Sequence, residues 1–249
     1  MAGIELQMVA MKKINSHSGV ACAIVWPQAT RGTLVQRKPM VWTQQLQSVD
    51  WGHASVCALV GYALGCFTSG YYLVRARTGN DIRNVDSGNV GARNVSRVLG
   101  RAGFLLTVLG DGGKGALAVL AAHHFTSNSI VSGIAMLAVV AGHVWPVQLK
   151  FRGGKGVATS LGALLVWDVR ILAAFLVFFL AGFVVARKTI LPGLFAFACL
   201  PPAAYWMTRD GLCTIIVSVL VAVVLFAHRN NFVEEIPALA SRRERGSQT

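Results

Sequence analysis

Long apolar segments separated by short polar connectors dominate the chain from Trp51 onward. A helix needs about 20 largely apolar residues to cross the hydrocarbon core of a bilayer, with a range of roughly 17–25. The pattern therefore indicates an all-α fold, a polytopic integral membrane protein with about seven transmembrane helices. The fourth of these helices is short, and the seven segments are His53–Val74, Gly103–Ala122, Ile130–Leu149, Val157–Val166, Ile171–Ala186, Ile190–Met207 and Leu212–Ala227.

Composition supports a lipid-facing surface rather than a large soluble core. Hydrophobic residues make up 54% of the chain and charged residues 13%, whereas soluble proteins average roughly 45–50% and about 25%. Too few polar side chains remain to cover a globule in water. The five cysteines are odd in number and form no CxxC pair, so we expect neither a disulfide framework nor a metal site.

The first 50 residues differ from the rest because they mix polar and apolar positions without a long apolar run. We interpret residues 1–50 as a disordered N-terminal extension, or as the product of a start codon assigned too far upstream. Residues 51–235 would form the seven-helix domain, and residues 236–249 a basic cytoplasmic tail.

The formal net charge of +13 would suggest nucleic acid for a soluble protein, but in a membrane protein Lys and Arg concentrate in cytoplasmic loops. We therefore expect no nucleic-acid partner. If the chain crosses the membrane seven times, the short loops on one side of the membrane contain only two cations, Arg170 and Arg209. The other side receives most of the cations, in the 75–101 loop, Lys150–Lys155, Arg187–Lys188 and the C-terminal tail. That side is predicted to be cytoplasmic, although the basic extension on the outside then strains the rule.

Three unusual segments fall on the predicted cytoplasmic side, and the first runs from Asp86 to Arg97. Glycines let the backbone approach a ligand, and successive N–H groups suit phosphate oxygens. Arg97 can add a bidentate contact to phosphate. An ordinary polar loop with a helix cap is the alternative. The candidate residues of this segment are Ser87, Gly88, Asn89, Gly91, Asn94 and Arg97.

The second segment, Lys150–Thr159, contains a Gly-Gly-Lys-Gly core where a helix is expected to begin. A helix N-terminus favours anions through its free N–H groups and its dipole, and a lysine adds a compact positive charge. The spacing excludes a Walker A loop, because Leu149 and Gly156 stand where that motif needs Gly and Ser or Thr. A topological basic loop is the alternative, and the candidates are Gly153, Gly154, Lys155 and Gly156.

The third segment is His228-Arg-Asn-Asn231 at the end of the last helix. Histidine is the commonest general base near neutral pH, although one at a helix end can simply interact with the helix dipole. Asp111 and Lys114 lie three apart on one helix face, and charge inside a span is a functional hypothesis by default. Lys114 is a candidate phosphate contact, unless the two charges only neutralise one another. We expect His143 to help shape the pocket.

Together these segments resemble the bacterial acyl-phosphate:glycerol-3-phosphate acyltransferases, the PlsY family. The resemblance runs from about Tyr62 to Asn231 and rests on three motifs in order. These are Ser87–Arg97, Gly142–Thr159 and His228…Asn231, with Asp81-Ile-Arg83 and the Asp111…Lys114-Gly115 pair in addition.

The resemblance implies a multi-pass enzyme of the bacterial inner membrane with an outward N-terminus and a cytoplasmic active site. It implies transfer of a fatty acyl group from acyl phosphate to the 1-hydroxyl of glycerol 3-phosphate, giving lysophosphatidic acid and phosphate. It further implies no metal, no cofactor and no acyl-CoA. We expect a monomer whose partners are the two substrates and membrane lipid.

Roles for the candidates follow as a hypothesis. Ser87 and the N–H groups near Gly88 and Gly91 would hold acyl phosphate, with Arg97 bridging phosphate charge. Lys155 and the backbone of the neighbouring glycines would hold glycerol 3-phosphate. His228 and Asn231 would position the attacking hydroxyl, whose proton passes either to His228 or to a substrate phosphate.

The sequence departs from the family pattern at several positions. The family usually has Gly where Asp86 stands and Thr where Arg93 stands, and Ala227 replaces a usual Arg. Glu234 and Glu235 follow the third motif where a Gly-x-Glu is common. Because an acidic residue beside an anion site is unfavourable, we expect Arg93 to pair with Asp86.

Two other classes of protein fit the basic loops. A transporter for a phosphorylated solute would also carry an intramembrane charge pair, but it would favour broken helices with midplane sites. A non-catalytic binder of anionic lipid would also use basic juxtamembrane loops.

Overall fold

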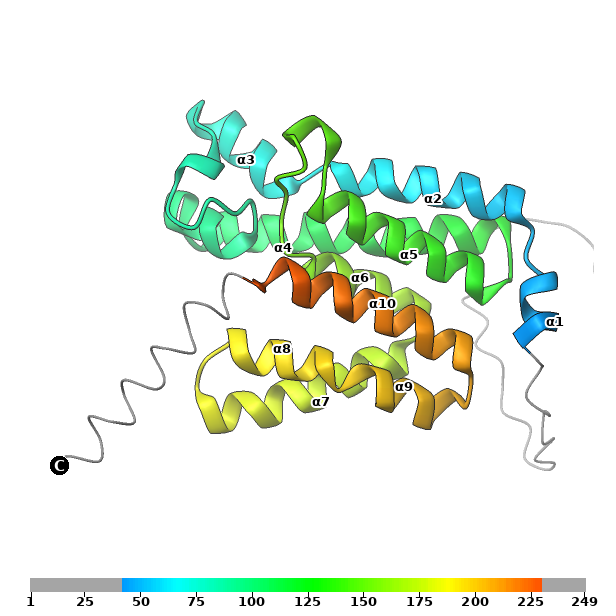
Figure 1. Cartoon of the computed structure of the whole chain (residues 1–249). Helices are drawn as coiled ribbons and strands as arrows, with labels where there is room; N and C mark the ends of the chain where they lie inside the picture. The colour runs from blue at the N-terminus through cyan, green and yellow to red at the C-terminus, as the bar shows by residue number, and fades with distance from the viewer. Residues whose placement is uncertain (1–41, 230–249) are drawn as a thin grey trace, which may run out of the picture. The chain divides into compact units, whose positions relative to one another are not determined.

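The computed structural model describes residues 42–229, which are helical and contain no β-strand. Figure 1 shows the long helices lying side by side along a common direction. The predicted all-α fold class is confirmed. The elements are α1 (Trp42–Gln47), α2 (Trp51–Cys66), α3 (Ser69–Thr78), η1 (Ile82–Asn84), α4 (Ala92–Phe125), α5 (Ser129–Val144), η2 (Val147–Leu149), α6 (Val157–Trp167), α7 (Val169–Ala186), α8 (Ile190–Ala198), α9 (Leu200–Thr208) and α10 (Gly211–Ala227).

Five helical stretches of the described chain are long and apolar enough to cross a membrane. Two of them are broken helices, the α2–α3 pair and the α8–α9 pair, and the others are α4, α5 with its extension to Leu149, and α7. The apolar helices α6 and α10 are shorter. All seven predicted segments coincide with these helices, while the number of crossings stays a prediction. The protein is a multi-pass membrane protein.

Glycines allow the backbones of neighbouring helices to approach closely at two crossings. A Cβ atom on Gly65 of α2 would overlap the carbonyl of Val139, and one on Gly142 of α5 would overlap that of Tyr62. The same holds between α4 and α6, where Gly115 faces the carbonyl of Thr159. Small residues at such contacts are typical of membrane helices, which associate mainly through close packing. These close contacts between helices hold α4, α5 and α6, from which the loops with candidate residues extend, in fixed positions.

Helix α4 is interrupted at Gly100, whose φ of 63° and ψ of −157° are not helical. Its 34 residues would span about 51 Å at 1.5 Å per residue, well beyond a hydrocarbon core of about 30 Å. The interruption therefore separates a polar first section, which contains Arg93 and Arg97, from the apolar section that crosses the bundle. The first section carries the end of the Asp86–Arg97 segment.

The N-terminal boundary of the domain lies earlier than residue 51, which corrects our assignment of residues 42–50 to a disordered extension. The Gln45 side chain donates a hydrogen bond to Asp210 over 3.1 Å, and the Trp42 ring lies against Gly211. Val49 is buried in a cluster with α2 and α5. Residues 42–50 contain only scattered apolar positions, so the hydrophobic pattern of the sequence does not reveal that this segment is ordered. The remainder of the predicted extension, the predicted C-terminal tail and Asn231 lie outside the described residues.

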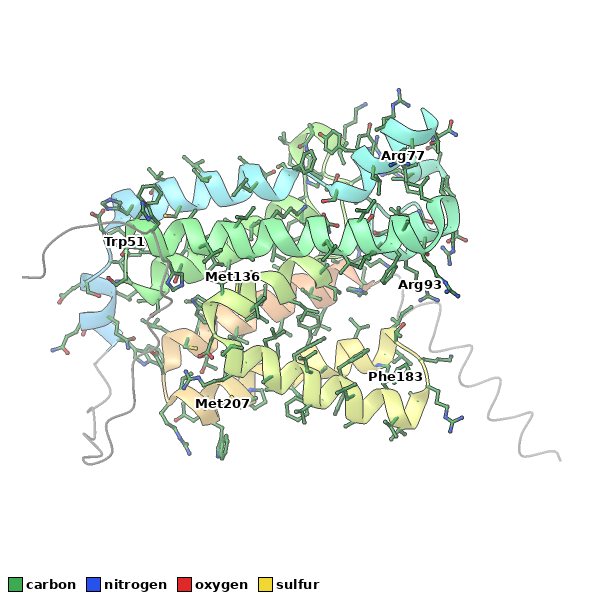
Figure 2. The ribbon with its side chains drawn as sticks, turned by 180° about the vertical axis from the view of Figure 1, so that it is seen from behind. Trp51, Arg77, Arg93, Met136, Phe183 and Met207 are labelled. Carbon is green, nitrogen blue, oxygen red and sulfur yellow. The ribbon has the colours of Figure 1, made fainter. Side chains whose placement is uncertain are left out.

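The loops with the candidate residues gather at one end of the bundle. Figure 1 shows that the 79–91 loop, the 145–156 loop, the 187–189 loop and the end of α10 lie at the same end. Figure 2 shows Arg77 and Arg93 at this end, and Trp51 and Met207 at the opposite one. The connectors that carry most of the cations therefore lie at one end of the bundle, as the charge pattern predicts.

Candidate active site

The 79–91 loop is held from within by Asn94, a residue that we expected to bind substrate. The Asn94 side chain is 2% exposed, and its Nδ2 donates to the carbonyl oxygens of Ile82, Val85 and Asn89 over 3.2, 2.9 and 2.9 Å. An amide nitrogen has two protons, so no donor remains for a ligand. Asn94 therefore organises the loop in this structure.

Ser87 is presented on a tight turn between two residues in the left-handed region. Asp86 has a φ of 45° and Gly88 a φ of 66°, and a non-glycine residue such as Asp86 rarely adopts this conformation. Strained backbone of this kind clusters at functional sites. The turn leaves Ser87 exposed at the surface of the loop.

The glycine N–H groups of this loop are not directed at a ligand. Gly88 donates to the carbonyl of Val85 over 3.0 Å, and Gly91 donates to the side chain of Asn89 over 2.7 Å. This corrects the expectation that they hold phosphate directly, and Asn89 serves as the acceptor that orders the turn. Gly91 caps α4 without a side-chain hydrogen bond. The N–H groups of the first turn of α4 are the ones that a helix leaves without intrahelical partners.

Asp86 pairs with Arg97 through its carboxylate and the guanidinium Nη1, which corrects the expected pairing with Arg93. The carboxylate of Asp86 reaches Arg97 on the second turn of α4 rather than Arg93 on the first turn. Both partners of the pair are roughly half exposed. The charge of Arg97 is thus held beside the loop and shared with a carboxylate.

Arg83 connects the 79–91 loop with the 145–156 loop. It forms an ion pair with Asp81 over 2.6 Å and donates to the carbonyl of Leu149 over 2.9 Å. The hydrogen bond from Arg83 lowers the pKa of the Asp81 carboxyl, which therefore stays ionised. Apolar side chains of both loops and of the flanking helices α3 and α4 form one small core of Val74, Ile82, Val90, Val95 and Leu149.

The Gly-Gly-Lys-Gly segment folds back onto the end of α5 before it enters α6. Gly153 donates to the carbonyl of Val144 over 3.1 Å, and Gly154 donates to that of His143 over 2.9 Å. These two N–H groups are therefore used inside the protein. Gly156, with a φ of 81°, caps α6 without a side-chain hydrogen bond. The first turn of α6 consequently has the free N–H groups that favour an anion, with half-buried Lys155 beside it.

His228 follows the last residue of α10 and is 7% exposed. Its Nδ1 lies 2.8 Å from the carbonyl oxygen of Val224. Because a carbonyl can only accept, Nδ1 carries the proton, and the neutral ring keeps a lone pair on Nε2. Burial lowers the pKa of His228, the hydrogen bond to Val224 opposes this, and the nearby charge of Lys155 lowers it further. A neutral imidazole with a free Nε2 can accept a proton.

The second and third motifs meet at this end of the bundle. Lys155 lies close enough to influence the titration of His228, and Gly156 packs toward Val224 of α10. Within residues 42–229, no hydrogen bond joins Ser87 to His228. The first motif instead meets the second through Arg83 and the shared apolar core.

Lys114 does not face the site as a phosphate contact, contrary to our expectation. It is 6% exposed, and its Nζ lies 3.0 and 2.6 Å from the carbonyl oxygens of Gly65 and Phe67. It also lies 3.1 Å from Asp111 and 2.9 Å from Nδ1 of His143. An ammonium has three protons, and protein groups take all of them. The alternative that Asp111 and Lys114 neutralise one another agrees with this geometry.

A cationic helix N-terminus, a neutral histidine with a free nitrogen and a loop on a strained turn therefore share one end of a helical membrane bundle. These features make this end of the bundle the candidate site for an anionic substrate.

The family described as glycerol-3-phosphate acyltransferase matches residues 55–236. The chain is 40% identical over 200 residues to glycerol-3-phosphate acyltransferase 1 of Desulfitobacterium hafniense (strain Y51), covering 80% of this chain and 99% of the relative. It is 38% identical over 178 residues to glycerol-3-phosphate acyltransferase of Halorhodospira halophila (strain DSM 244 / SL1), covering 72% and 90%. The chain belongs to the glycerol-3-phosphate acyltransferase family.

Two solved structures of PlsY (YgiH), an integral membrane glycerol 3-phosphate acyltransferase, share the fold. The glycerol 3-phosphate form gives a TM-score of 0.68 at 31% identity, and it covers 74% of this chain and 92% of that one. The lysophosphatidic acid form gives a TM-score of 0.66 at 28% identity with the same coverage. These matches confirm the resemblance that the three motifs indicated.

Proposed function

We propose that the protein transfers a fatty acyl group from acyl phosphate to the 1-hydroxyl of glycerol 3-phosphate, in phospholipid synthesis. The products are lysophosphatidic acid and inorganic phosphate. The acyltransferase activity on glycerol 3-phosphate is supported by membership of the family. The observation that carries the site is that Gly156, directly after Lys155 at the N-terminus of α6, packs toward Val224. The carbonyl oxygen of Val224 lies 2.8 Å from Nδ1 of His228, which leaves Nε2 to accept a proton.

Glycerol 3-phosphate would bind with its phosphate at the first turn of α6, beside Lys155. The helix dipole and the free N–H groups favour a dianion there. His228 would then lie beside the glycerol hydroxyls, with Asn231 as a proposed second contact. Orienting the hydroxyl in this way removes much of the entropic cost of bringing two substrates together.

Acyl phosphate would bind at the first motif, with its phosphate near Ser87 and the first turn of α4. Arg97 would exchange its contact with Asp86 for the substrate phosphate, because a bidentate guanidinium matches phosphate oxygens. Gly88, Asn89, Gly91 and Asn94 would act by holding the turn. The acyl chain would lie against the apolar helices, in contact with membrane lipid.

In the reaction, the hydroxyl oxygen of glycerol 3-phosphate attacks the acyl carbonyl carbon, and the bond from this carbon to the phosphate oxygen breaks. Inorganic phosphate leaves with the electron pair of that bond. The hydroxyl proton passes to Nε2 of His228 or to a phosphate oxygen. Positive groups near the developing oxyanion would lower the barrier.

The site would face the cytoplasm of a bacterial inner membrane, and the protein would act as a monomer. The support for this orientation is the excess of Lys and Arg at the end that carries the three motifs and the positive-inside rule.

The helix break within the α2–α3 span bears on the transporter alternative. Transporters bind solutes at broken helices near the midplane. Here Lys114 and Asp111 already contact the backbone at the break, so the protein itself occupies it. This favours the enzyme.

A comparison of donors tests the proposal. Purified protein in lipid would receive glycerol 3-phosphate together with an acyl phosphate, the matching acyl-CoA or the matching acyl carrier protein. We expect lysophosphatidic acid from acyl phosphate alone. Product from acyl-CoA or acyl carrier protein at an equal rate would contradict the proposed donor, while leaving the acyltransferase activity in place.

A further inference from the structure

The charged cluster inside the bundle begins at the break between α2 and α3. Phe67 and Thr68 are extended, so the last carbonyls of α2 and the first N–H groups of α3 lack helical partners. Lys114 donates to the carbonyls of Gly65 and Phe67. Asp111, one turn earlier on α4, accepts from the N–H of Ser69 over 3.1 Å. A cation thus meets a helix C-terminus and an anion meets a helix N-terminus, as the helix dipoles favour.

His143 joins this pair from α5. Its Nδ1 lies 2.9 Å from Lys114 Nζ and 3.6 Å from Asp111 Oδ1. The ammonium can only donate, so Nδ1 accepts, and the neutral ring carries its proton on Nε2. All three side chains are at most 6% exposed, which gives the ring a fixed orientation.

The other edge of the His143 ring lies against Gly154. A Cβ atom on Gly154 would overlap Nε2 and lie 2.6 Å from Cε1, so only glycine allows this approach without displacing the ring. The backbone of His143 also accepts the N–H of Gly154 over 2.9 Å. The ring and backbone of one residue therefore fix the position of the segment directly before Lys155.

We propose that Asp111, Lys114 and His143 are positioning residues, which set the Gly-Gly-Lys-Gly segment so that Lys155 and the first turn of α6 meet the phosphate of glycerol 3-phosphate. The proposal rests on the proposed function. It also relates the two halves of the site, because the same charged pair fixes the start of α3, the helix that leads into the 79–91 loop.

Kinetics of His143 variants test this positioning. His143→Leu removes the acceptor for Lys114, while His143→Asn keeps an acceptor near the place of Nδ1. We expect His143→Leu to raise KM for glycerol 3-phosphate by about tenfold or more, since a misplacement of about 1 Å can cost about 100-fold. KM for acyl phosphate should change by less than about twofold, because Asp111, which holds the N–H of Ser69 at the start of α3, is kept in this variant. His143→Asn should restore most of the affinity for glycerol 3-phosphate.

A second set of variants keeps the test independent of the folding of His143→Leu. Gly154→Ala should raise KM for glycerol 3-phosphate in the native background, because the new methyl group displaces the ring. In the His143→Asn background the smaller side chain leaves room, so the same substitution should cost much less. Such non-additivity is the signature of two groups in contact. Gly113→Ala is the matched control, because a Cβ atom there meets nothing within 4 Å, and it should behave as the native enzyme.

Two results would overturn the positioning role. One is an unchanged KM for glycerol 3-phosphate in folded His143→Leu with kcat alone reduced, and the other is an equal effect of Gly154→Ala in both backgrounds. The proposed function is judged separately by the native enzyme in the same assay. An active native enzyme with either result refutes the positioning role alone, whereas an inactive native enzyme refutes the proposed function.

Discussion

The Nδ1 atom of His228 lies 2.8 Å from the carbonyl oxygen of Val224, one helical turn earlier on α10. This hydrogen bond fixes the tautomer and points Nε2 away from its own helix. The pKa of His228 is lowered by burial and by Lys155. The ring is therefore neutral near pH 7, as a general base must be.

The pH dependence of the reaction follows from this shift. Only neutral His228 can accept a proton, so kcat should fall as the pH falls through the pKa of His228, which lies below the ordinary value of about 6.5. Lys155→Gln removes a cation that opposes protonation, so it should move this acid limb to higher pH. Lys150→Gln, in the same loop, should leave the limb in place. Histidine NMR titrations of each variant, assigned with His228→Gln, measure the pKa directly, and a His228 pKa above 6.5 in the native enzyme would contradict the assignment.

Removal of the Asn94 amide should destabilise the 79–91 loop. Asn94→Ala removes the donor that the carbonyls of Ile82, Val85 and Asn89 share. The first two keep a backbone donor, so the loss falls mainly on Asn89, and a buried polar group without a partner costs about 1–3 kcal/mol. We expect a lower thermal unfolding midpoint in detergent and a loss of activity. Ser96→Ala is a suitable control, because that hydroxyl bonds only to its own helical turn. Equal midpoints for Asn94→Ala and the control would be incompatible with a loop held by Asn94.

Arg97, rather than Arg93, should matter for the acyl donor. Arg97→Gln removes the guanidinium held by Asp86 and should lower kcat/KM for acyl phosphate by about 100-fold, a loss typical of a transition-state contact. Arg93→Thr leaves the pair of Asp86 and Arg97 intact, so it should have little effect. Asp86→Asn frees the guanidinium and should lower KM for acyl phosphate, but only when Arg97 is present. A larger loss for Arg93→Thr than for Arg97→Gln would contradict this assignment.

The segment before α2 should contribute to stability. A chain beginning at Trp51 lacks the Gln45–Asp210 hydrogen bond and the Asp50 side chain, which caps α2 by accepting from Gly52 and His53. Loss of a cap alone costs about 1 kcal/mol. We expect a lower unfolding midpoint than for a chain beginning at Trp42, measured in the same detergent. Identical midpoints would mean that α1 and the cap add nothing.

Most of the architecture follows from the apolar pattern, because a helix satisfies its own backbone hydrogen bonds in lipid and its apolar side chains face the bilayer. Because each helix crosses the bilayer, successive connectors lie on alternate sides, and this places the three motifs at one end of the bundle. The pattern cannot locate α1, which is short and mixed in polarity. It also cannot locate the break at Phe67 and Thr68, since neither residue is a helix breaker and the partners that satisfy the break lie about 50 residues later on α4.

The sequence predicts which residues belong to the candidate site better than it predicts their hydrogen-bond and ion-pair partners. Glycine-rich loops with cations indicate an anion site, but the sequence does not say which N–H groups stay free. In the structure, four of these N–H groups donate hydrogen bonds within the protein, those of Gly88, Gly91, Gly153 and Gly154. The choice between Arg93 and Arg97 for Asp86 depended on a left-handed turn at Asp86, which the local sequence permits but does not require. Such details are set by tertiary contacts rather than by local pattern.

The most direct test of the account is the stoichiometry of the reaction catalysed by purified protein in lipid. With acyl phosphate and glycerol 3-phosphate, we predict equal amounts of lysophosphatidic acid and inorganic phosphate, and neither product at a comparable rate in His228→Gln. Phosphate release without lysophosphatidic acid, or no product while a control acyltransferase is active in the same lipid, would contradict acyl transfer at this site.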